Sequence, residues 1–161
     1  MIENSTTKEI YIYTDGSCHT QKRVGAWVAI LIIDKNEIIL QGNEMDTTHN
    51  RMEILGVIKA IEYIIENYQK STSVHLITDS QYVMGIPERS DKLSTNDFIT
   101  KKGKALNNAD LIKILMKVLR EQPVSFYKIK AHQKEGDNIN YNNVVDKISR
   151  NIVRDLVKNM N

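Results

Sequence analysis

Four acidic residues stand where a folded chain tolerates unpaired charge poorly: Asp15, Glu53, Asp79 and Asp146. Asp15 and Asp79 each close an apolar run typical of a strand (residues 10–14 and 74–78), whereas Glu53 and Asp146 each open an amphipathic helical pattern. If the two strand ends are neighbours, the four carboxylates converge. Carboxylates gathered in this way raise each other's pKa and oppose ionisation unless a divalent cation neutralises them.

Magnesium is the cation that such a set of ligands favours. Oxygen-only ligation with an incomplete shell suits Mg²⁺, which keeps water molecules and takes its remaining ligands from substrate phosphate. The four acids therefore predict metal-assisted cleavage of phosphodiesters.

Each acid also has a simpler explanation when it is taken alone. Asp15 and Asp79 fit turn residues at strand ends, and Glu53 and Asp146 fit first-turn acids that the helix dipole favours. Only the joint pattern favours a metal site. Cys18 is assigned no chemistry.

Hydrophobic periodicity predicts the elements that carry these acids. Alternating or continuous apolar runs predict five strands, at residues 9–14, 26–33, 37–42, 74–78 and 124–130. Apolar spacings of three and four predict helices over 54–68, 111–119 and 145–156, with a short helix from Ser80. Polar residues 47–50 are suited to capping the first helix. Three meandering strands, followed by helices that alternate with two further strands, predict an α/β fold.

Composition permits a nucleic-acid enzyme without demanding one. The 161 residues are 41% hydrophobic and 26% charged, which predicts a single domain over residues 1–161 with its own core. The net charge of +2 is too mild to establish a nucleic-acid partner by itself. One cysteine excludes an internal disulfide framework, and we find neither a signal segment nor a membrane-length apolar stretch. We expect a cytoplasmic protein.

Five short motifs follow one another along nearly the whole chain. They are Thr14-Asp15-Gly16-Ser17, Thr48-His49-Asn50-Arg51-Met52-Glu53, Thr78-Asp79-Ser80-Gln81-Tyr82-Val83, Lys130-Ala131-His132, and residues 142–146. A lone Asp-Gly-Ser is an ordinary turn, but five motifs in order are specific. In these motifs the chain resembles the type 1 ribonucleases H of the retroviral-integrase-like fold. The resemblance implies a five-stranded mixed sheet, three antiparallel strands and then two parallel ones, flanked by helices.

The same resemblance implies a reaction and its cofactor. The reaction is hydrolysis of the RNA strand in an RNA/DNA hybrid, which leaves 5′-phosphate and 3′-hydroxyl ends. The four acids would hold two Mg²⁺ ions roughly 4 Å apart, with Mn²⁺ as an alternative. His132 matches a family histidine that assists proton transfer or product departure; a solvated loop histidine is the simpler alternative.

Substrate contacts also follow from the resemblance. Gly16, Ser17, Asn50 and Gln81 would lie near the RNA strand, Thr48 with Asn107 or Asn108 near a DNA phosphate, and Lys101 and Lys102 in a basic segment that grips the hybrid. Those lysines would add affinity through counterion release without reading sequence. Helix capping remains an alternative for Thr48 and Asn108, as does a merely solvated surface for residues 89–104.

Three departures from the family pattern affect the substrate contacts and leave the four acids intact. Residues 19–23 replace a Gly/Pro-rich turn, His49 stands where an amide is common, and the basic segment lacks the tryptophans usual there. We therefore expect altered substrate positioning rather than altered catalysis. Lys22 and Arg23 could compensate through phosphate contacts.

Three functional classes remain open at this point. The first is a hybrid nuclease that acts as a monomer, with no membrane and no obligate protein partner. The second is a related polynucleotidyl transferase, such as an integrase or a junction resolvase. The third is a non-catalytic hybrid-binding module, which has no reason to retain four unpaired acids.

Overall fold

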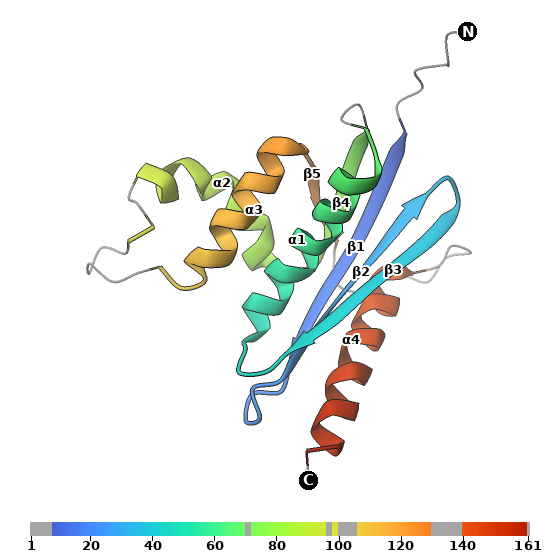
Figure 1. Cartoon of the computed structure of the whole chain (residues 1–161), viewed down its shortest axis with the longest axis vertical. Helices are drawn as coiled ribbons and strands as arrows, with labels where there is room; N and C mark the ends of the chain where they lie inside the picture. The colour runs from blue at the N-terminus through green and yellow to red at the C-terminus, as the bar shows by residue number, and fades with distance from the viewer. Residues whose placement is uncertain (1–7, 70–71, 96–97, 100–105, 130–139, 161) are drawn as a thin grey trace, which may run out of the picture.

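One mixed sheet forms the centre of the molecule (Figure 1). The structure is a computed structural model that describes residues 8–69, 72–95, 98–99, 106–129 and 140–160. Its strands are β1 (Glu9–Cys18), β2 (Gly25–Ile33), β3 (Asn36–Glu44), β4 (Ser73–Thr78) and β5 (Ser125–Lys128). Their spatial order is β3-β2-β1-β4-β5. The pairs β1–β2 and β2–β3 are antiparallel, and β1–β4 and β4–β5 are parallel. The predicted α/β fold and sheet arrangement are confirmed.

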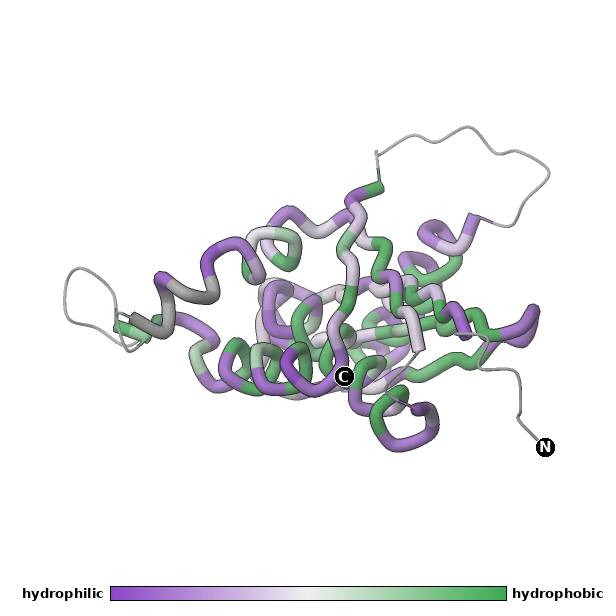
Figure 2. Tube along the Cα trace, turned by 90° about the horizontal axis from the view of Figure 1, so that it is seen from above, coloured by the Kyte–Doolittle hydropathy of each residue, from purple (hydrophilic) through white to green (hydrophobic). Residues whose placement is uncertain are grey.

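Helices cover both faces of the sheet. They are α1 (His49–Asn67), α2 (Gln81–Thr95), α3 (Ala109–Glu121) and α4 (Tyr141–Lys158). The main core lies between the sheet and the helices α1, α2 and α3. Helix α4 packs on the opposite face against β1 and β2, where Val145 and Val153 are buried. Helical turns alternate between hydrophobic and hydrophilic residues in Figure 2, as expected of helices with one buried face.

Strand β1 is longer than its apolar run predicts. We expected β1 to end before Asp15, but it continues to Cys18. Its antiparallel partner β2 begins at Gly25, which pairs with Cys18, so the ladder extends past Asp15. Ladder hydrogen bonds thus outweigh the low strand preference of Asp-Gly-Ser. The parallel pairing with β4 ends earlier, at Tyr13 opposite Ile77. Asp15 therefore lies inside β1, just beyond the part of β1 that pairs with β4.

The helices also begin earlier than their apolar stripes predict. Helix α1 begins at His49 and α4 at Tyr141, so Glu53 and Asp146 are not first-turn residues. The explanation of these two acids by the helix dipole is therefore wrong. Helix α2 continues through Pro87 to Thr95 and is therefore longer than the short helix expected from Ser80. Burial of Val83 and Ile86 anchors this helix despite the backbone hydrogen bond that proline removes.

None of the helices in the described residues combines the length and the apolar character needed to cross a membrane.

Candidate metal centre

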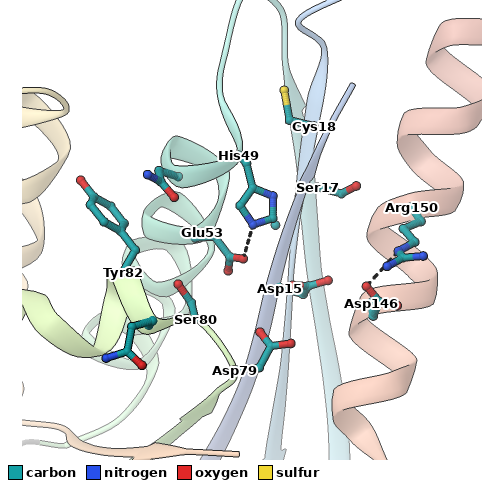
Figure 3. A pocket seen from close by; sticks show the side chains of 13 residues that line it. Asp15, Ser17, Cys18, His49, Glu53, Asp79, Ser80, Tyr82, Asp146 and Arg150 are labelled. Atoms are coloured by element: carbon teal, nitrogen blue, oxygen red, sulfur yellow. Dashed lines mark hydrogen bonds and ion pairs between the residues drawn. The ribbon is translucent and has the colours of Figure 1, made fainter. Parts of the chain in front are cut away.

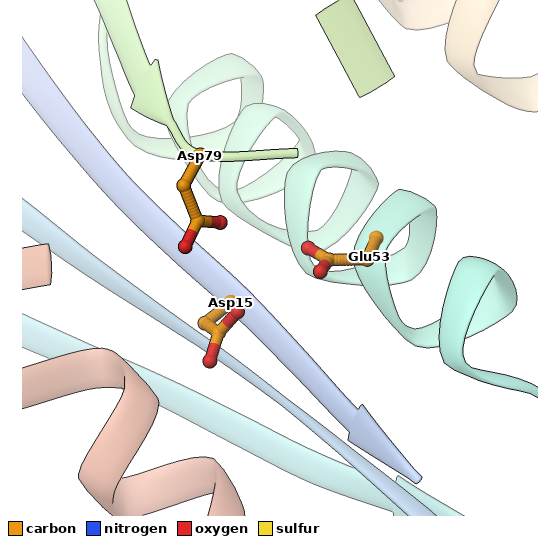
Figure 4. Close-up of side chains that lie close together, drawn as sticks. All are labelled: Asp15, Glu53 and Asp79. Carbon is orange, nitrogen blue, oxygen red and sulfur yellow. The ribbon is translucent and has the colours of Figure 1, made fainter. Parts of the chain in front are cut away.

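The end of the parallel strand pair brings the first two acids together. Asp15 lies two residues beyond the last paired residue of β1 with β4, and Asp79 directly follows β4. Parallel strands point in one direction, so their carboxyl ends meet at one edge of the sheet. The two side chains consequently point into the same space (Figure 4).

Helix α1 supplies the third acid because Gly16 lets it approach β1 closely. A Cβ atom on Gly16 would lie 2.5 Å from the Glu53 nitrogen and 2.7 Å from the Met52 carbonyl carbon, far inside van der Waals contact. The helix backbone thus rests directly on the strand. Glu53, in the second turn of α1, is 3% exposed and faces Asp15.

Asp15, Glu53 and Asp79 form a compact group. One ligand oxygen from each lies within 4.8 Å of the others. Glu53 Oε2 is buried and accepts no hydrogen bond within the part of the chain that the structure describes. An orphaned buried carboxylate oxygen beside two further carboxylates fits a hard divalent cation, which prefers oxygen ligands.

The pKa values of the buried acids also indicate a site suited to positive charge. Burial, followed by the charges of Glu53, Asp79 and Asp146, raises the pKa of Asp15 to about 8. Burial also raises the pKa of Glu53, although His49 opposes this increase. A cation bound at this site would favour the ionised forms of Asp15 and Glu53.

Asp146 lies in the same pocket but outside the compact group. Its Oδ1 atom accepts a hydrogen bond of 3.1 Å from Arg150 Nε, one turn further along α4. The side chain of Asp146 is 44% exposed and lies on α4 beside Arg150 (Figure 3). The expected convergence of four acids is therefore a tight group of three with the fourth held beside it.

The pocket around the acids has a volume of about 540 Å³. Its lining is almost entirely polar: Asp15, Gly16, Ser17, Cys18, His49, Asn50, Glu53, Asp79, Ser80, Gln81, Tyr82, Asp146 and Arg150. All four residues expected near the RNA strand are in this set. Lys128 donates a hydrogen bond to Gln81 Oε1 and so ties α2 to β5 at the rim.

The residues expected near a DNA phosphate lie outside this pocket lining. Thr48 Oγ1 accepts a hydrogen bond of 3.2 Å from the Arg51 backbone nitrogen, so it caps α1. Asn108 forms no side-chain cap; its Nδ2 donates to the Tyr82 hydroxyl at 3.1 Å. Asn107 is exposed beside it.

Some residues expected to contact the substrate lie outside the described residues, and Arg23 contacts another side chain. His132, Lys101 and Lys102 lie outside the described residues. Arg23 Nε donates to Asp46 Oδ1 at 2.8 Å, whereas Lys22 is exposed.

Three residues contact the acids and were given no role from the sequence. His49 Nε2 lies 2.9 Å from Glu53 Oε1, and this hydrogen bond raises the pKa of His49. Ser149 Oγ donates to Asp15 Oδ2 at 3.1 Å, and Arg150 pairs with Asp146. The available signal was helical spacing, since His49 precedes Glu53 by four positions and Ser149 and Arg150 follow Asp146 by three and four.

The fold and the site together define a class of protein: a mixed-sheet α/β protein with a carboxylate group suited to divalent metal at the open end of its parallel strands. Comparison with known proteins narrows this class. The RNase H family model matches residues 7–154. The chain is 32% identical to "Ribonuclease H" of Caldicellulosiruptor saccharolyticus over 151 residues, 92% of this chain and 99% of that relative. It is 38% identical to "Ribonuclease HI" of Xylella fastidiosa over 132 residues, 81% of this chain and 85% of that relative.

Solved structures share the fold at lower identity. A structure of LC9-RNase H1, described as a type 1 RNase H with the type 2 active-site motif, superposes with a TM-score of 0.77 at 18% identity, over 94% of this chain and 74% of that one. A foamy viral protease-reverse transcriptase in complex with dsDNA gives 0.68 at 20% identity, over 93% and 96%. The chain belongs to the RNase H family, a family of hydrolytic nucleases.

Proposed function

We propose that this protein is an endoribonuclease that hydrolyses the RNA strand of RNA/DNA hybrids with the help of Mg²⁺. The observation that carries this proposal is the group formed by Asp15, Glu53 and Asp79, with ligand oxygens within 4.8 Å of one another. The unpaired Glu53 Oε2 supports it, because that atom lacks a partner that a cation would supply. The names of the curated relatives, each called ribonuclease H, support the choice of substrate.

The four acids would hold two Mg²⁺ ions, with Mn²⁺ as an alternative. When bound, such ions neutralise charge at the scissile phosphate and activate a water molecule, so that 5′-phosphate and 3′-hydroxyl ends result. Asp15 and Glu53 are buried and therefore provide rigid ligands, whereas Asp146 is half-exposed and must release Arg150 to join them. His132 would assist proton transfer or product departure.

Substrate binding would use the polar pocket and the surface beside it. Gly16, Ser17, Asn50 and Gln81 line the pocket and would face the 2′-hydroxyl groups that distinguish RNA from DNA. Thr48, with Asn107 or Asn108, would contact a DNA phosphate, and Lys101 and Lys102 would add affinity that is independent of sequence. We further propose that residues 1–161 act as one domain and as a monomer.

Cleavage assays on three substrates test this function. Labelled RNA/DNA hybrid, duplex DNA and duplex RNA would each be incubated with the protein in Mg²⁺ or in chelator. We expect cleavage of the hybrid's RNA strand alone, and only with Mg²⁺. Binding of hybrid without cleavage would support a non-catalytic module, and cutting or joining of duplex DNA would support a polynucleotidyl transferase.

A further inference from the structure

A buried serine on α4 contacts the acid at the centre of the site. Ser149 is 0% exposed, and its Oγ lies 3.1 Å from Asp15 Oδ2 and 3.0 Å from the Asp146 carbonyl oxygen. The residue therefore joins β1 to α4 at the level of the metal ligands. It is the one side-chain donor to Asp15 found among the residues that the structure describes.

The hydroxyl has one proton and two acceptors in reach. An ionised carboxylate is the stronger acceptor, since charge-assisted hydrogen bonds are about twice as strong as neutral ones. The carbonyl of Asp146 lies within α4, where the backbone ladder already supplies donors. The proton of Ser149 is therefore directed to Asp15 whenever that acid is ionised.

We propose that Ser149 is a positioning residue for metal binding, which fixes Oδ2 of Asp15 and leaves the other carboxylate oxygen to the cation. This inference rests on the proposed function, because it assumes that Asp15 is a metal ligand. A carboxylate held at one oxygen presents the other in one direction, whereas a free carboxylate rotates about its terminal bond. The same contact sets the distance at which α4 presents Asp146.

Metal binding without substrate provides the direct measurement. Mg²⁺ titration by calorimetry and Mn²⁺ titration by electron paramagnetic resonance would compare the full chain with Ser149→Ala. We expect the variant to bind either ion about 10- to 100-fold more weakly, the usual cost of losing a hydrogen bond to a metal ligand. Ser149→Cys keeps a weak donor of similar size and should lie between the two.

Val153→Ala is the matched control. Val153 lies one turn further along the same helix, is 7% exposed, and packs with Val24 and Ala26 rather than with the acids. Its truncation should lower the melting temperature more than Ser149→Ala does and leave metal affinity within about twofold, because it removes buried packing and keeps the hydrogen bond from Ser149 to Asp15. If Val153→Ala weakens metal binding as much as Ser149→Ala does, loose packing of α4 explains both effects and the inference is overturned.

Kinetics separates positioning from substrate binding. For Ser149→Ala, kcat on hybrid should fall at limiting Mg²⁺ and recover as Mg²⁺ is raised, with an unchanged KM for hybrid. Wild-type affinity for Mg²⁺ in this variant would refute the role of Ser149 while leaving the proposed function intact. A wild-type chain that neither binds Mg²⁺ nor cleaves hybrid would refute the proposed function itself.

Discussion

Asp15 is the acid whose pKa is raised by burial and by three neighbouring carboxylates. It is 6% exposed, lies close to Glu53 and Asp79, and has a pKa raised to about 8. Asp15→Asn keeps the shape and removes the charge. We expect hybrid cleavage to fall more than about a hundredfold, because a proposed ligand is lost rather than a partner of one. In chelator at pH 8 the variant should be more stable than wild type by up to about 5 kcal/mol, since the pKa of Asp15 is raised from 3.8 to about 8 and each pKa unit is worth about 1.4 kcal/mol.

Activity and urea unfolding, measured on the same preparations, check both halves of this prediction. Near pH 3 the two proteins should unfold at almost the same urea concentration, because wild-type Asp15 is then largely protonated in either state. A variant that loses activity and stability together at pH 8 would show that Asp15 serves the fold rather than a metal.

The pH dependence of stability has a defined sign in the absence of metal. The pKa values of Asp15 and Glu53 are raised by burial, and that of His49 is raised by its hydrogen bond to Glu53. The native state therefore binds more protons than the unfolded state between about pH 4 and pH 8, and stability falls as pH rises through this window. We expect a loss of up to about 5 kcal/mol in chelator across this window.

Saturating Mg²⁺ should offset much of this decline, since a cation bound only to the native state adds about 2.7 kcal/mol at a hundred times its dissociation constant. Denaturant titrations at several pH values, with and without Mg²⁺, would measure it. A flat profile in chelator would contradict the raised pKa values.

Arg150 would compete with a bound cation for Asp146, the fourth proposed ligand. The pair is a solvent-exposed contact at helical spacing, so Arg150→Gln should change the free energy of unfolding by less than about 0.5 kcal/mol. The Mg²⁺ concentration needed for half-maximal cleavage should fall a few-fold, because Asp146 is released. Lys147→Gln removes the same charge from an exposed neighbour and serves as the control. An equal effect of both changes would indicate general electrostatics rather than the ion pair.

The acids could be selected from the sequence because they stand at breaks in hydrophobic periodicity. Their partners could not be selected in the same way. Ser149 meets Asp15 across 134 positions, and that contact depends on how α4 lies against β1, which no local pattern encodes. His49 lies on α1 at a spacing that favours contact with Glu53, but a helical position alone does not distinguish an ion pair from a solvated face.

At the scale of elements, the approach of α1 to β1 determines whether Glu53 reaches the site. Gly16→Ala would place a methyl group 2.5 Å from the Glu53 backbone nitrogen, and neither backbone can yield cheaply. We expect destabilisation of about 1–3 kcal/mol from overpacking, together with weaker Mg²⁺ binding as Glu53 is displaced. Unfolding in chelator and calorimetric Mg²⁺ titration measure the two effects.

Gly56→Ala, three positions beyond Glu53 on α1, is the matched control for that change. Its added Cβ would meet nothing closer than the Val28 carbonyl oxygen at 3.5 Å. Alanine is the better helix former, so this variant should gain up to about 1 kcal/mol and keep its metal affinity. Similar losses from both substitutions would remove the special role of the contact at Gly16.

Element types and their order followed from periodicity, but their ends did not. The extension of β1 through Asp15 depends on its pairing with β2, which continues as far as Cys18 opposite Gly25. The Asp-Gly-Ser motif favours a turn locally, and the ladder overrides that preference. Similarly, α2 continues through Pro87 because buried neighbours anchor it. Tertiary contacts, which act across the chain, decided these two boundaries.

At the scale of the whole molecule, helices pack on both faces of one sheet, so we expect the described fold to unfold as a single unit. The main core joins β1, β2 and β4 to three helices, and α4 packs on the other face of the same strands. Trp27, the only tryptophan, is 9% exposed in β2 and lies against Gly42 of β3, so its fluorescence reports on the antiparallel half of the sheet. Far-ultraviolet circular dichroism reports mainly on the helices.

In chelator and in Mg²⁺ alike, the two signals should therefore give coincident urea transitions with one midpoint, as small single domains do. Mg²⁺ should move both midpoints upward together, because the proposed ligands come from β1, α1, α4 and the end of β4 and thus join both layers to the sheet. A fluorescence transition that precedes the dichroism transition, or that alone responds to Mg²⁺, would show that the β2–β3 half opens separately and would contradict a single cooperative domain.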